Sequence, residues 1–357
     1  MRRSSSILWL VLLAGLVVLA AWQSRRLAGV RRERLPETYT GAASDVPPAI
    51  TFVMVGLGGF RGVVSEVLWF RANRLQEEGR YFELVQLADW LTMLDPHASE
   101  AWVYNAWNLA YNVSVMMGRP EDRLRWVLNG ITLLRDEGLR FNPRDARLYR
   151  ELAWFYQNKV GDELDSAHLT YKVALARQLD PCVNTNGTVH VTPENRERLS
   201  AMRLDTDRMV ALEQRFGPLD WRLANSHAIY WAAQGLEFAT GHERLMSRRA
   251  VYQPLILSVA NGRLTGDIDA RQWRTAPNLD LALPVAEFLM DTHRDHPSAT
   301  MKMVARRFLS YAIYELHRNG RDDEARQLFA QLIALPSESG RRPSFEDVIK
   351  KVEQSYE

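Results

Sequence analysis

Residues 65–96 read SEVLWFRANRLQEEGRYFELVQLADWLTMLDP, and residues 306–336 read RRFLSYAIYELHRNGRDDEARQLFAQLIALP, 241 positions later in the chain. In both stretches apolar residues recur every three or four positions on either side of a glycine, Gly79 or Gly320. This spacing predicts two amphipathic helices joined by a turn at the glycine. Two such hairpins in the same register indicate an internal repeat. The matched positions are Leu68, Ala72, Leu75, Leu84, Ala88 and Leu91 in the first stretch, and Leu309, Ile313, Leu316, Ala325, Phe329 and Leu332 in the second.

The rest of the chain follows the same helical pattern. The 357 residues are 46% hydrophobic and 25% charged, a balance typical of two ordinary domains or of one extended solenoid. From Ile50 onward the helical period dominates, and no stretch alternates apolar and polar residues clearly enough to predict a strand. The predicted fold class is therefore all-α, a solenoid of helix-turn-helix repeats.

Charge and cysteine content exclude several classes of function. The 45 basic and 43 acidic residues are spread along the chain and give a net charge of +2, so there is no electrostatic footprint for nucleic acid. Cys182 is the single cysteine, which excludes an intramolecular disulfide and a multi-cysteine metal site. The segment 291–296 holds two aspartates and two histidines, which supply at most half of a metal site. We predict no cofactor, no metal and no nucleic-acid partner.

The amino terminus carries an apolar run. Ile7–Trp22 contains no charged residue and lies between Arg2-Arg3 and Arg25-Arg26. At a rise of about 1.5 Å per residue the run spans roughly 24 Å, and its uncharged flanks bring it close to the thickness of a bilayer core. Residues 1–24 are therefore predicted to form a single-pass transmembrane anchor, in a bacterial inner membrane. A cleaved signal sequence is the alternative, and the side of the membrane that the body faces stays open.

Composition divides the chain behind the anchor into four parts. Residues 25–49 contain several Pro, Gly and Ala residues without an apolar period, and they are predicted to be a linker. Within the C-terminal part, Pro254 is expected to break or kink its helix, and residues 261–278 are expected to form a loop. The predicted parts after the linker are 50–181, N-terminal repeats; 182–219, a loop and a connecting helix; and 220–357, C-terminal helical hairpins.

The skeleton of residues 65–96 resembles the tetratricopeptide repeat (TPR), a helix-turn-helix unit of 34 residues. Residues 308–336 fit the same pattern, so 50–181 is identified as TPR-like and 220–357 as ending in a TPR unit. Pro96, Pro143 and Pro181 close successive units. Their separations of 47 and 38 residues exceed the repeat length of the family, which predicts insertions and, in the second unit, a lengthened turn.

In this family the first helix of each unit lines a concave groove. The resemblance implies that aromatic and amide side chains line the groove of this chain. They suit an extended peptide, because amides pair with its backbone and rings supply contact area. The groove residues implied in this way are Trp69, Asn73 and Gln76 from the first unit, Trp107 and Tyr111 from the second, and Tyr149 and Tyr156 from the third.

We therefore expect a membrane-anchored scaffold or assembly factor that binds a protein or peptide partner. The alternative is an enzyme, or an accessory of cell-envelope polymer processing, built on a helical array. Its cavity would use the polar groups of Asn105, Asn108, His227 and Glu237. A third possibility is that the aromatic rings fill a core thickened by the insertions and the protein has a structural role. An open aromatic strip favours the binding module, and a closed polar cavity favours the enzyme. The identity of the partner and the oligomeric state stay undetermined.

Overall fold

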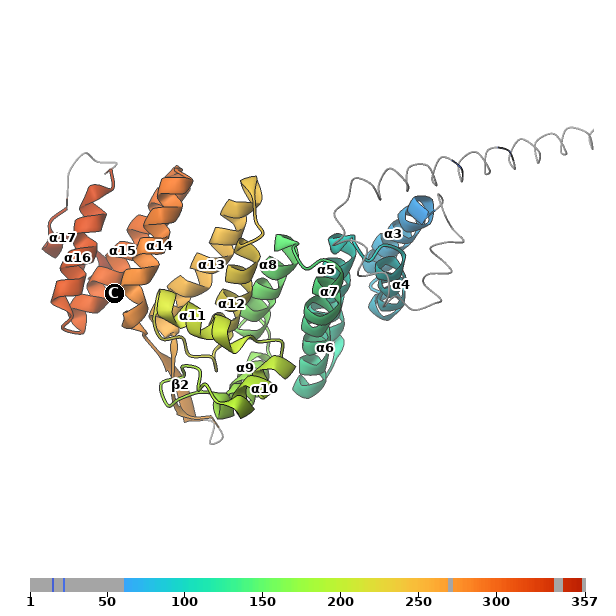
Figure 1. Cartoon of the computed structure of the whole chain (residues 1–357), viewed down its shortest axis with the longest axis horizontal. Helices are drawn as coiled ribbons and strands as arrows, with labels where there is room; N and C mark the ends of the chain where they lie inside the picture. Colours follow the sequence, from blue (N-terminus) through green and yellow to red (C-terminus); the bar gives the residue numbers. More distant parts are fainter. Residues whose placement is uncertain (1–14, 16–21, 23–60, 269–271, 337–342, 355–357) are drawn as a thin grey trace, which may run out of the picture.

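The computed structural model describes residues 15, 22, 61–268, 272–336 and 343–354. Most of these residues are helical, and the helices stand in a row that runs from α3 to α17 (Figure 1). The mainly helical content of the described residues agrees with the predicted all-α fold class. Residues 1–49, which include the predicted anchor and linker, lie outside the described residues apart from Gly15 and Trp22. Within the described ranges, no helix is both long enough and apolar enough to span a bilayer.

The first half of the row contains the helices of residues 61–182, where the N-terminal repeats are predicted. In chain order they are α3 (Arg61–Glu77), α4 (Tyr81–Leu94), α5 (Ser99–Trp107), η4 (Asn108–Val113), η5 (Ser114–Met116), α6 (Pro120–Thr132), η6 (Leu133–Gly138), α7 (Leu139–Phe141), α8 (Ala146–Trp154), η7 (Phe155–Val160), α9 (His168–Leu179) and η8 (Asp180–Cys182). Elements η4, η6 and η7 are π-helical, whereas η5 and η8 are short 3₁₀ turns.

The second half contains longer helices and one hairpin. In chain order its elements are α10 (Pro193–Ala201), α11 (Thr206–Phe216), α12 (Ala224–Leu236), α13 (Gly241–Asn261), β1 (Arg263–Asp267), β2 (Gln272–Ala276), η9 (Leu279–Leu281), α14 (Ala282–Asp295), α15 (Ala299–Arg318), α16 (Asp322–Ala334) and α17 (Phe345–Glu353). The connecting region after Cys182 therefore holds two helices, α10 and α11, and not one.

Residues 65–96 and residues 306–336 each form a helix pair, and the two pairs have the same turn. Gly79 has a φ of +70° and Gly320 a φ of +72°, a left-handed conformation that glycine adopts without a steric penalty. A hydrogen bond from the second residue of the turn back into the first helix closes each pair. The closing bonds run from the Arg80 amide to the Leu75 carbonyl and from the Arg321 amide to the Leu316 carbonyl, each over 2.9 Å.

The extra residues of the second unit lie inside its helices. Helix α5 continues through η4 and η5, and α6 continues through η6 and α7, whereas only residues 117–119 connect the two. The predicted lengthened turn is therefore wrong. A longer helix buries additional apolar side chains, such as Leu109, Val113 and Leu134. A longer turn would instead add backbone N–H and C=O groups that have to form hydrogen bonds with water.

Pro254 lies within α13 and does not end it, since the helix continues to Asn261. The proline is buried, and its carbonyl accepts a hydrogen bond of 2.8 Å from the Ser258 hydroxyl. Helix α13 packs against both α12 and α14. This tertiary packing compensates for the loss of the backbone hydrogen bond that proline cannot donate.

Residues 261–278, predicted to form a loop, contain an antiparallel hairpin. Strand β1 pairs with β2 in a register that places Arg263 opposite Ala276 and Asp267 opposite Gln272. In β1 only Leu264 is buried, so the stretch lacks the regular alternation by which a half-buried strand is predicted. The loop prediction is wrong here because pairing of the two backbones forms these strands.

Helices from distant parts of the chain share the central core. Gly235 lets α12 approach α8 closely, since a Cβ atom at Gly235 would lie 2.5 Å from the Cβ of Tyr149. The rings of Trp231 and Phe238 lie beside Tyr149, with centroids 6.3 and 5.6 Å away, and Phe155, Trp221 and Tyr230 are fully buried in the same core. The first helix pair has a smaller core of its own, built from Ala72, Leu75, Leu84, Leu87, Leu91 and Ala101.

Candidate functional site

The groove residues predicted from the first unit lie on α3. Asn73 and Gln76 are exposed, and Trp69 is half-buried. Tyr104 of α5 joins them. Its ring meets that of Trp69 edge to face at 5.1 Å, and its hydroxyl donates a hydrogen bond of 2.7 Å to the Gln76 side chain. These contacts join the first helices of two consecutive units.

Trp107 and Tyr111 follow Tyr104 at intervals of three and four residues, so the three side chains share one face of the helix. The Trp107 and Tyr111 rings are stacked, with centroids 4.2 Å apart, and both meet the buried ring of Phe155 edge to face. The Tyr111 hydroxyl lies beside the indole of Trp154. Burial raises the pKa of Tyr111 well above its usual value, so this hydroxyl stays protonated.

Helix α8 contributes to the same surface. Trp107 donates a hydrogen bond of 2.8 Å from its indole nitrogen to the carboxylate of Glu151, and Trp154 is 44% exposed. We call this surface the aromatic strip. It consists of Trp69, Asn73, Gln76, Tyr104, Trp107, Tyr111 and Trp154.

Trp154 is a residue that the resemblance misses, because it lies outside the groove positions of the family. A helical wheel would have found it. Leu148, Leu152 and Phe155 define the buried face of this helix, and Trp154 falls on the opposite side.

Tyr149 and Tyr156, also predicted for the groove, lie in the core. Tyr149 is 6% exposed and Tyr156 is 9% exposed. The Tyr149 hydroxyl donates to the carbonyl of Pro143 over 2.9 Å, and the Tyr156 ring stacks on His227 at 4.9 Å. Helix α12 covers both rings, so the structure does not bring them to the aromatic strip.

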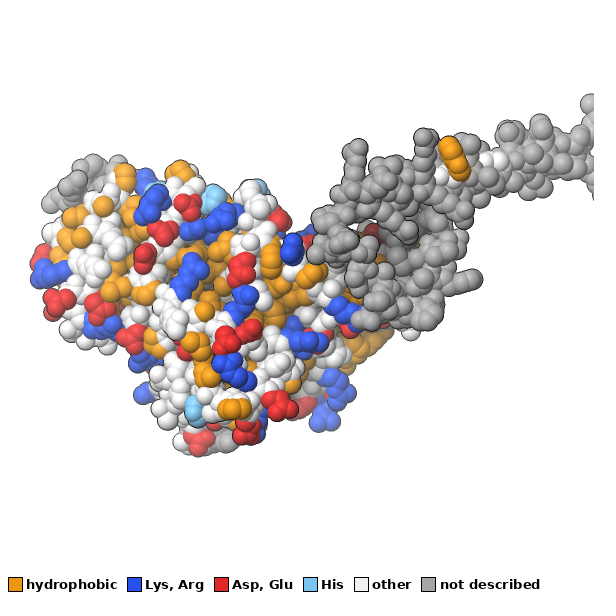
Figure 2. Space-filling model, in the orientation of Figure 1, with side chains coloured by type: hydrophobic (Ala, Val, Ile, Leu, Met, Phe, Trp, Pro, Cys, Tyr) orange, Lys and Arg blue, Asp and Glu red, His pale blue; other side chains and the backbone are white. Residues whose placement is uncertain are grey.

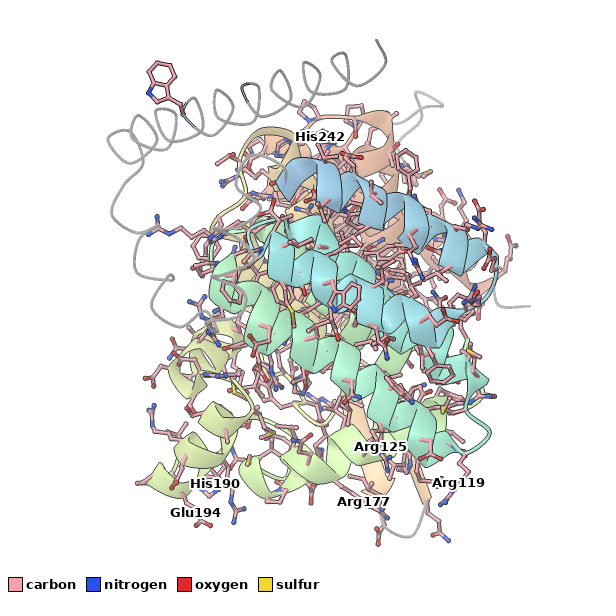
Figure 3. The ribbon with its side chains drawn as sticks, turned by 90° about the vertical axis from the view of Figure 1, so that its right-hand side faces the viewer. Arg119, Arg125, Arg177, His190, Glu194 and His242 are labelled. Atoms are coloured by element: carbon pink, nitrogen blue, oxygen red, sulfur yellow. The ribbon has the colours of Figure 1, made fainter. Side chains whose placement is uncertain are left out.

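A cleft of about 1070 Å³ opens where several helices end. Its walls come from η7, α9, the start of α12, the end of α13 and β2. Figure 3 looks at the molecule from its α3 end, where Arg177 of the cleft lies at the bottom and His242, at the start of α13, lies at the top. The lining includes Gln157, Asn158, Lys172, Leu223, Leu257 and Trp273.

The aromatic strip leads to this cleft. Asn158 lines the cleft and lies one helical turn after Trp154. The Asn158 side chain donates a hydrogen bond of 3.3 Å from its Nδ2 atom to the Trp154 carbonyl. The lining combines amides, charges of both signs and apolar side chains. Burial lowers the pKa of Lys172, and its ammonium lies 3.8 Å from Glu163. Such a lining can pair with backbone groups of an extended peptide and can contact its side chains.

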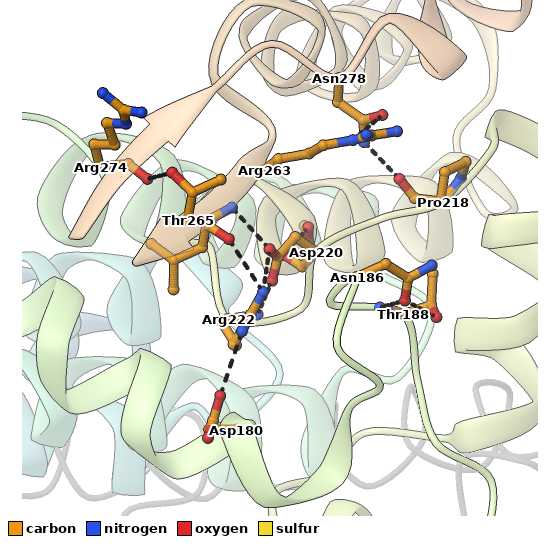
Figure 4. Close-up of polar contacts among 12 residues, drawn as sticks. Asp180, Asn186, Thr188, Pro218, Asp220, Arg222, Arg263, Thr265, Arg274 and Asn278 are labelled. Carbon is orange, nitrogen blue, oxygen red and sulfur yellow. Dashed lines mark hydrogen bonds and ion pairs between the residues drawn. The ribbon is translucent and has the colours of Figure 1, made fainter. Parts of the chain in front are cut away.

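Asp220 holds the hairpin wall of the cleft in place (Figure 4). Its side chain is only 1% exposed, and its carboxylate accepts the Leu264 amide of β1 at 2.9 Å and the Arg222 guanidinium at 2.8 and 2.9 Å. The hydrogen bonds to Asp220 raise the pKa of Arg222 above its usual value, so Arg222 stays charged. This buried pair fastens β1 to the loop that precedes α12.

The four polar residues of the enzyme alternative lie in different places. Asn105 donates to Asp89 at 2.9 Å and Asn108 donates to the Tyr81 carbonyl at 3.2 Å, so both fasten the second unit to α4. His227 is buried in the core, and Glu237 is exposed and pairs with Arg208. No cavity found among the described residues brings these four side chains together.

Comparisons with protein-family models, with curated proteins and with solved structures find no match to this chain. In the part of the chain that the structure describes, no three His, Cys, Asp or Glu side chains are grouped as metal ligands. The predicted cluster at 291–296 instead contributes ion pairs, from Asp291 to Arg294 at 3.1 Å and from Asp295 to Arg248 at 2.9 Å. The described residues therefore form a mainly helical protein of stacked helices. The rings of its aromatic strip are half-buried apart from Trp154, and this exposed end of the strip lies one helical turn from the cleft residue Asn158.

Proposed function

We propose that this protein is a membrane-anchored, TPR-like scaffold or assembly factor that binds an extended segment of a partner protein. The segment lies along the aromatic strip and enters the cleft. One observation carries the proposal. Aromatic side chains from the first helices of three consecutive units form two contacting groups, Trp69 with Tyr104, and Trp107 with Tyr111 and Trp154. Tyr104 and Trp107 lie one turn apart on the same helix and bring the two groups onto one face.

The strip is already ordered, which favours binding. Trp107 is fixed by its stack on Tyr111 and by its hydrogen bond to Glu151. Tyr104 is fixed by Trp69 and Gln76. A partner therefore does not spend binding energy on ordering these side chains, and rigid aromatic residues supply large contact areas.

Contacts that recur from unit to unit support a repeat protein of the TPR type. The Trp102 indole donates to the Pro96 carbonyl at 2.8 Å, and the Tyr149 hydroxyl donates to the Pro143 carbonyl at 2.9 Å. In both units an aromatic side chain in the first helix reaches back to the proline that closed the preceding unit. This bond sets the angle at which each new helix pair begins.

Exposed apolar side chains on α3 support the membrane location. Val63, Val67 and Phe70 are 61%, 61% and 74% exposed and form one stripe of the helix. At the other end of the row α17 packs against α15 and buries Val348. An end repeat needs a polar outer face in water, and α3 follows the predicted anchor at residues 1–24. We place this end of the row against the bilayer, in a bacterial inner membrane.

Site-specific crosslinking in intact membranes tests the proposal. A photoreactive amino acid at Gln76 or Asn158 of the full-length chain should capture a partner protein. Trp69→Ala together with Trp154→Ala should reduce its recovery more than tenfold, because aromatic anchors contribute about 2 kcal/mol each.

Trp90→Ala is the matched control, since Trp90 is 57% exposed but lies on α4, a second helix. It should leave recovery within twofold. Equal recovery with the double variant and the control, both folded by circular dichroism, would reject the strip as a binding surface.

A further inference from the structure

A second groove, of about 690 Å³, lies between α11, α12 and α13. Lys and Arg side chains gather on the face of the molecule where these helices lie, with acidic side chains among them (Figure 2). The groove is separate from the cleft. Arg244 of the groove and Leu257 of the cleft lie on the same helix, roughly 20 Å apart at 1.5 Å per residue.

The acidic side chains of the groove already have partners. Asp207 pairs with Arg196 at 2.7 Å, and Glu237 pairs with Arg208. The Asp205 carboxylate accepts two backbone amides at the start of α11, at 2.8 and 3.1 Å. Arg196 and Arg208 therefore balance the charges of Asp207 and Glu237, and the Asp205 carboxylate is held at the start of α11.

Three arginines crowd the other end of the groove. Arg215 and Arg248 both lie over the ring of Phe288, with guanidinium carbons 5.5 and 5.0 Å from its centroid. Arg248 is 8% exposed and donates one hydrogen bond to Asp295 and one to Thr292, each at 2.9 Å. Burial lowers the pKa of Arg248, and the nearby charges of Arg244 and Arg215 act in the same direction. Among the described residues neither Arg215 nor Arg244, both exposed, has an ion pair.

Between the charged ends the floor of the groove is apolar. Ala211 is exposed on α11, and Ala233 and Leu236 are half-buried on α12. A groove of about 690 Å³ has room for an apolar side chain of a ligand above this floor. The two unpaired guanidinium groups come from different helices, and each offers a pair of N–H donors that matches a carboxylate.

We propose that this groove binds an acidic segment of a partner protein, with carboxylates at Arg215 and Arg244 and an apolar side chain on Ala211, Ala233 and Leu236. Neither guanidinium group has an ion pair among the described residues, so each can bind a carboxylate of the ligand. The scaffold then has two distinct peptide sites, one at each end of α13.

A labelled synthetic peptide of alternating Glu and Leu, twelve residues long, tests this site on the full-length protein in detergent. Fluorescence anisotropy should show binding that weakens as salt increases. Arg215→Gln with Arg244→Gln should weaken binding at least tenfold, and Arg244→Gln alone at least threefold. Arg249→Gln is the matched control, because Arg249 is exposed on the same helix but does not line the groove.

Two results would overturn the proposal. One is equal affinity for the peptide with Gln in place of Glu. The other is displacement of the acidic peptide by 10 mM inorganic phosphate at matched ionic strength, which would assign the groove to small anions. Trp69→Ala with Trp154→Ala should leave this binding unchanged, so failure here is distinguishable from failure of the aromatic strip.

Discussion

The indole nitrogen of Trp107 donates a hydrogen bond of 2.8 Å to the carboxylate of Glu151. The two residues come from the first helices of neighbouring units, α5 and α8. The bond therefore fixes the angle between two units and orients the Trp107 ring on the aromatic strip at the same time.

This bond should contribute measurable coupling between the two units. Trp107→Phe keeps a ring against Tyr111 and Phe155 but removes the donor, and Glu151→Ala removes the acceptor. A double-mutant cycle in urea should give a coupling energy of about 1.5–3 kcal/mol, as expected for a hydrogen bond to a charged group. Strictly additive effects of the two substitutions would show that the bond contributes nothing.

The glycine turns should be sensitive to a single methyl group. Gly320 has a φ of +72° and open space around its missing Cβ, so Gly320→Ala adds backbone strain and no clash. The left-handed conformation costs an L-residue about 1–2 kcal/mol, and the urea midpoint should fall accordingly. Gly118→Ala also meets no neighbouring atom but has an ordinary φ, and it should change stability by less than about 0.5 kcal/mol. An equal effect of the two substitutions would contradict this account.

Acid should destabilise the protein through His227. Burial lowers the pKa of this histidine to about 4, against an ordinary value of 6.5. The folded protein therefore keeps the ring neutral where the unfolded chain takes up a proton. The stabilisation that neutral His227 contributes to the free energy of unfolding is complete above pH 6.5. It should decrease by about 3 kcal/mol as the pH falls to 4.

Urea titrations between pH 7.5 and 4.5 measure this loss. His227→Gln should flatten the profile, whereas His242→Gln, at an exposed position, should follow the wild type. Parallel profiles for the wild type and the His227 variant would reject this histidine as the origin of the acid sensitivity.

The buried carboxylate of Asp220 should contribute far more to the stability of the protein than the exposed carboxylate of Asp180. Asp220→Asn leaves Arg222, 12% exposed, without its main counter-charge, and breaking a buried pair costs about 3–5 kcal/mol. Asp180 also faces Arg222, at 3.4 Å, but is 56% exposed, so Asp180→Asn should cost under about 1 kcal/mol. Hydrogen exchange at the Leu264 amide should accelerate only in the Asp220 variant. Unchanged exchange there would show that another contact holds the hairpin.

Removal of residues 1–24 should release the protein from membranes. The expected outcome is recovery of the truncated chain in the supernatant after ultracentrifugation. If it stays in the pellet, the predicted anchor is not what holds it. Adding Val63→Ser, Val67→Ser and Phe70→Ser to the truncated chain then tests whether the exposed apolar stripe of α3 binds lipid by itself.

The helix pairs were predictable because their signals are local. The spacing of Leu68, Ala72 and Leu75 places them on one helix face, and the turn at Gly79 needs only a residue that tolerates a positive φ. The strip residues on α3, Trp69, Asn73 and Gln76, were instead expected from the groove positions of the family that the repeat resembles. Asn105 and Asn108, unusual inside a helix, could be noticed in the sequence, but their bonds to Asp89 and Tyr81 could not.

By itself, the sequence determined the two helix pairs that turn at Gly79 and Gly320, since apolar spacing and glycine act within a few residues. Only the tertiary structure decided which aromatic side chains face water. Tyr149 and Tyr156 occupy predicted groove positions, yet α12 packs on α8 at Gly235 and buries both, whereas Trp154 on the opposite side of the helix is exposed. Burial depends on contacts between residues far apart in the chain, and the hydrophobic pattern of one helix does not specify which other helix will cover it.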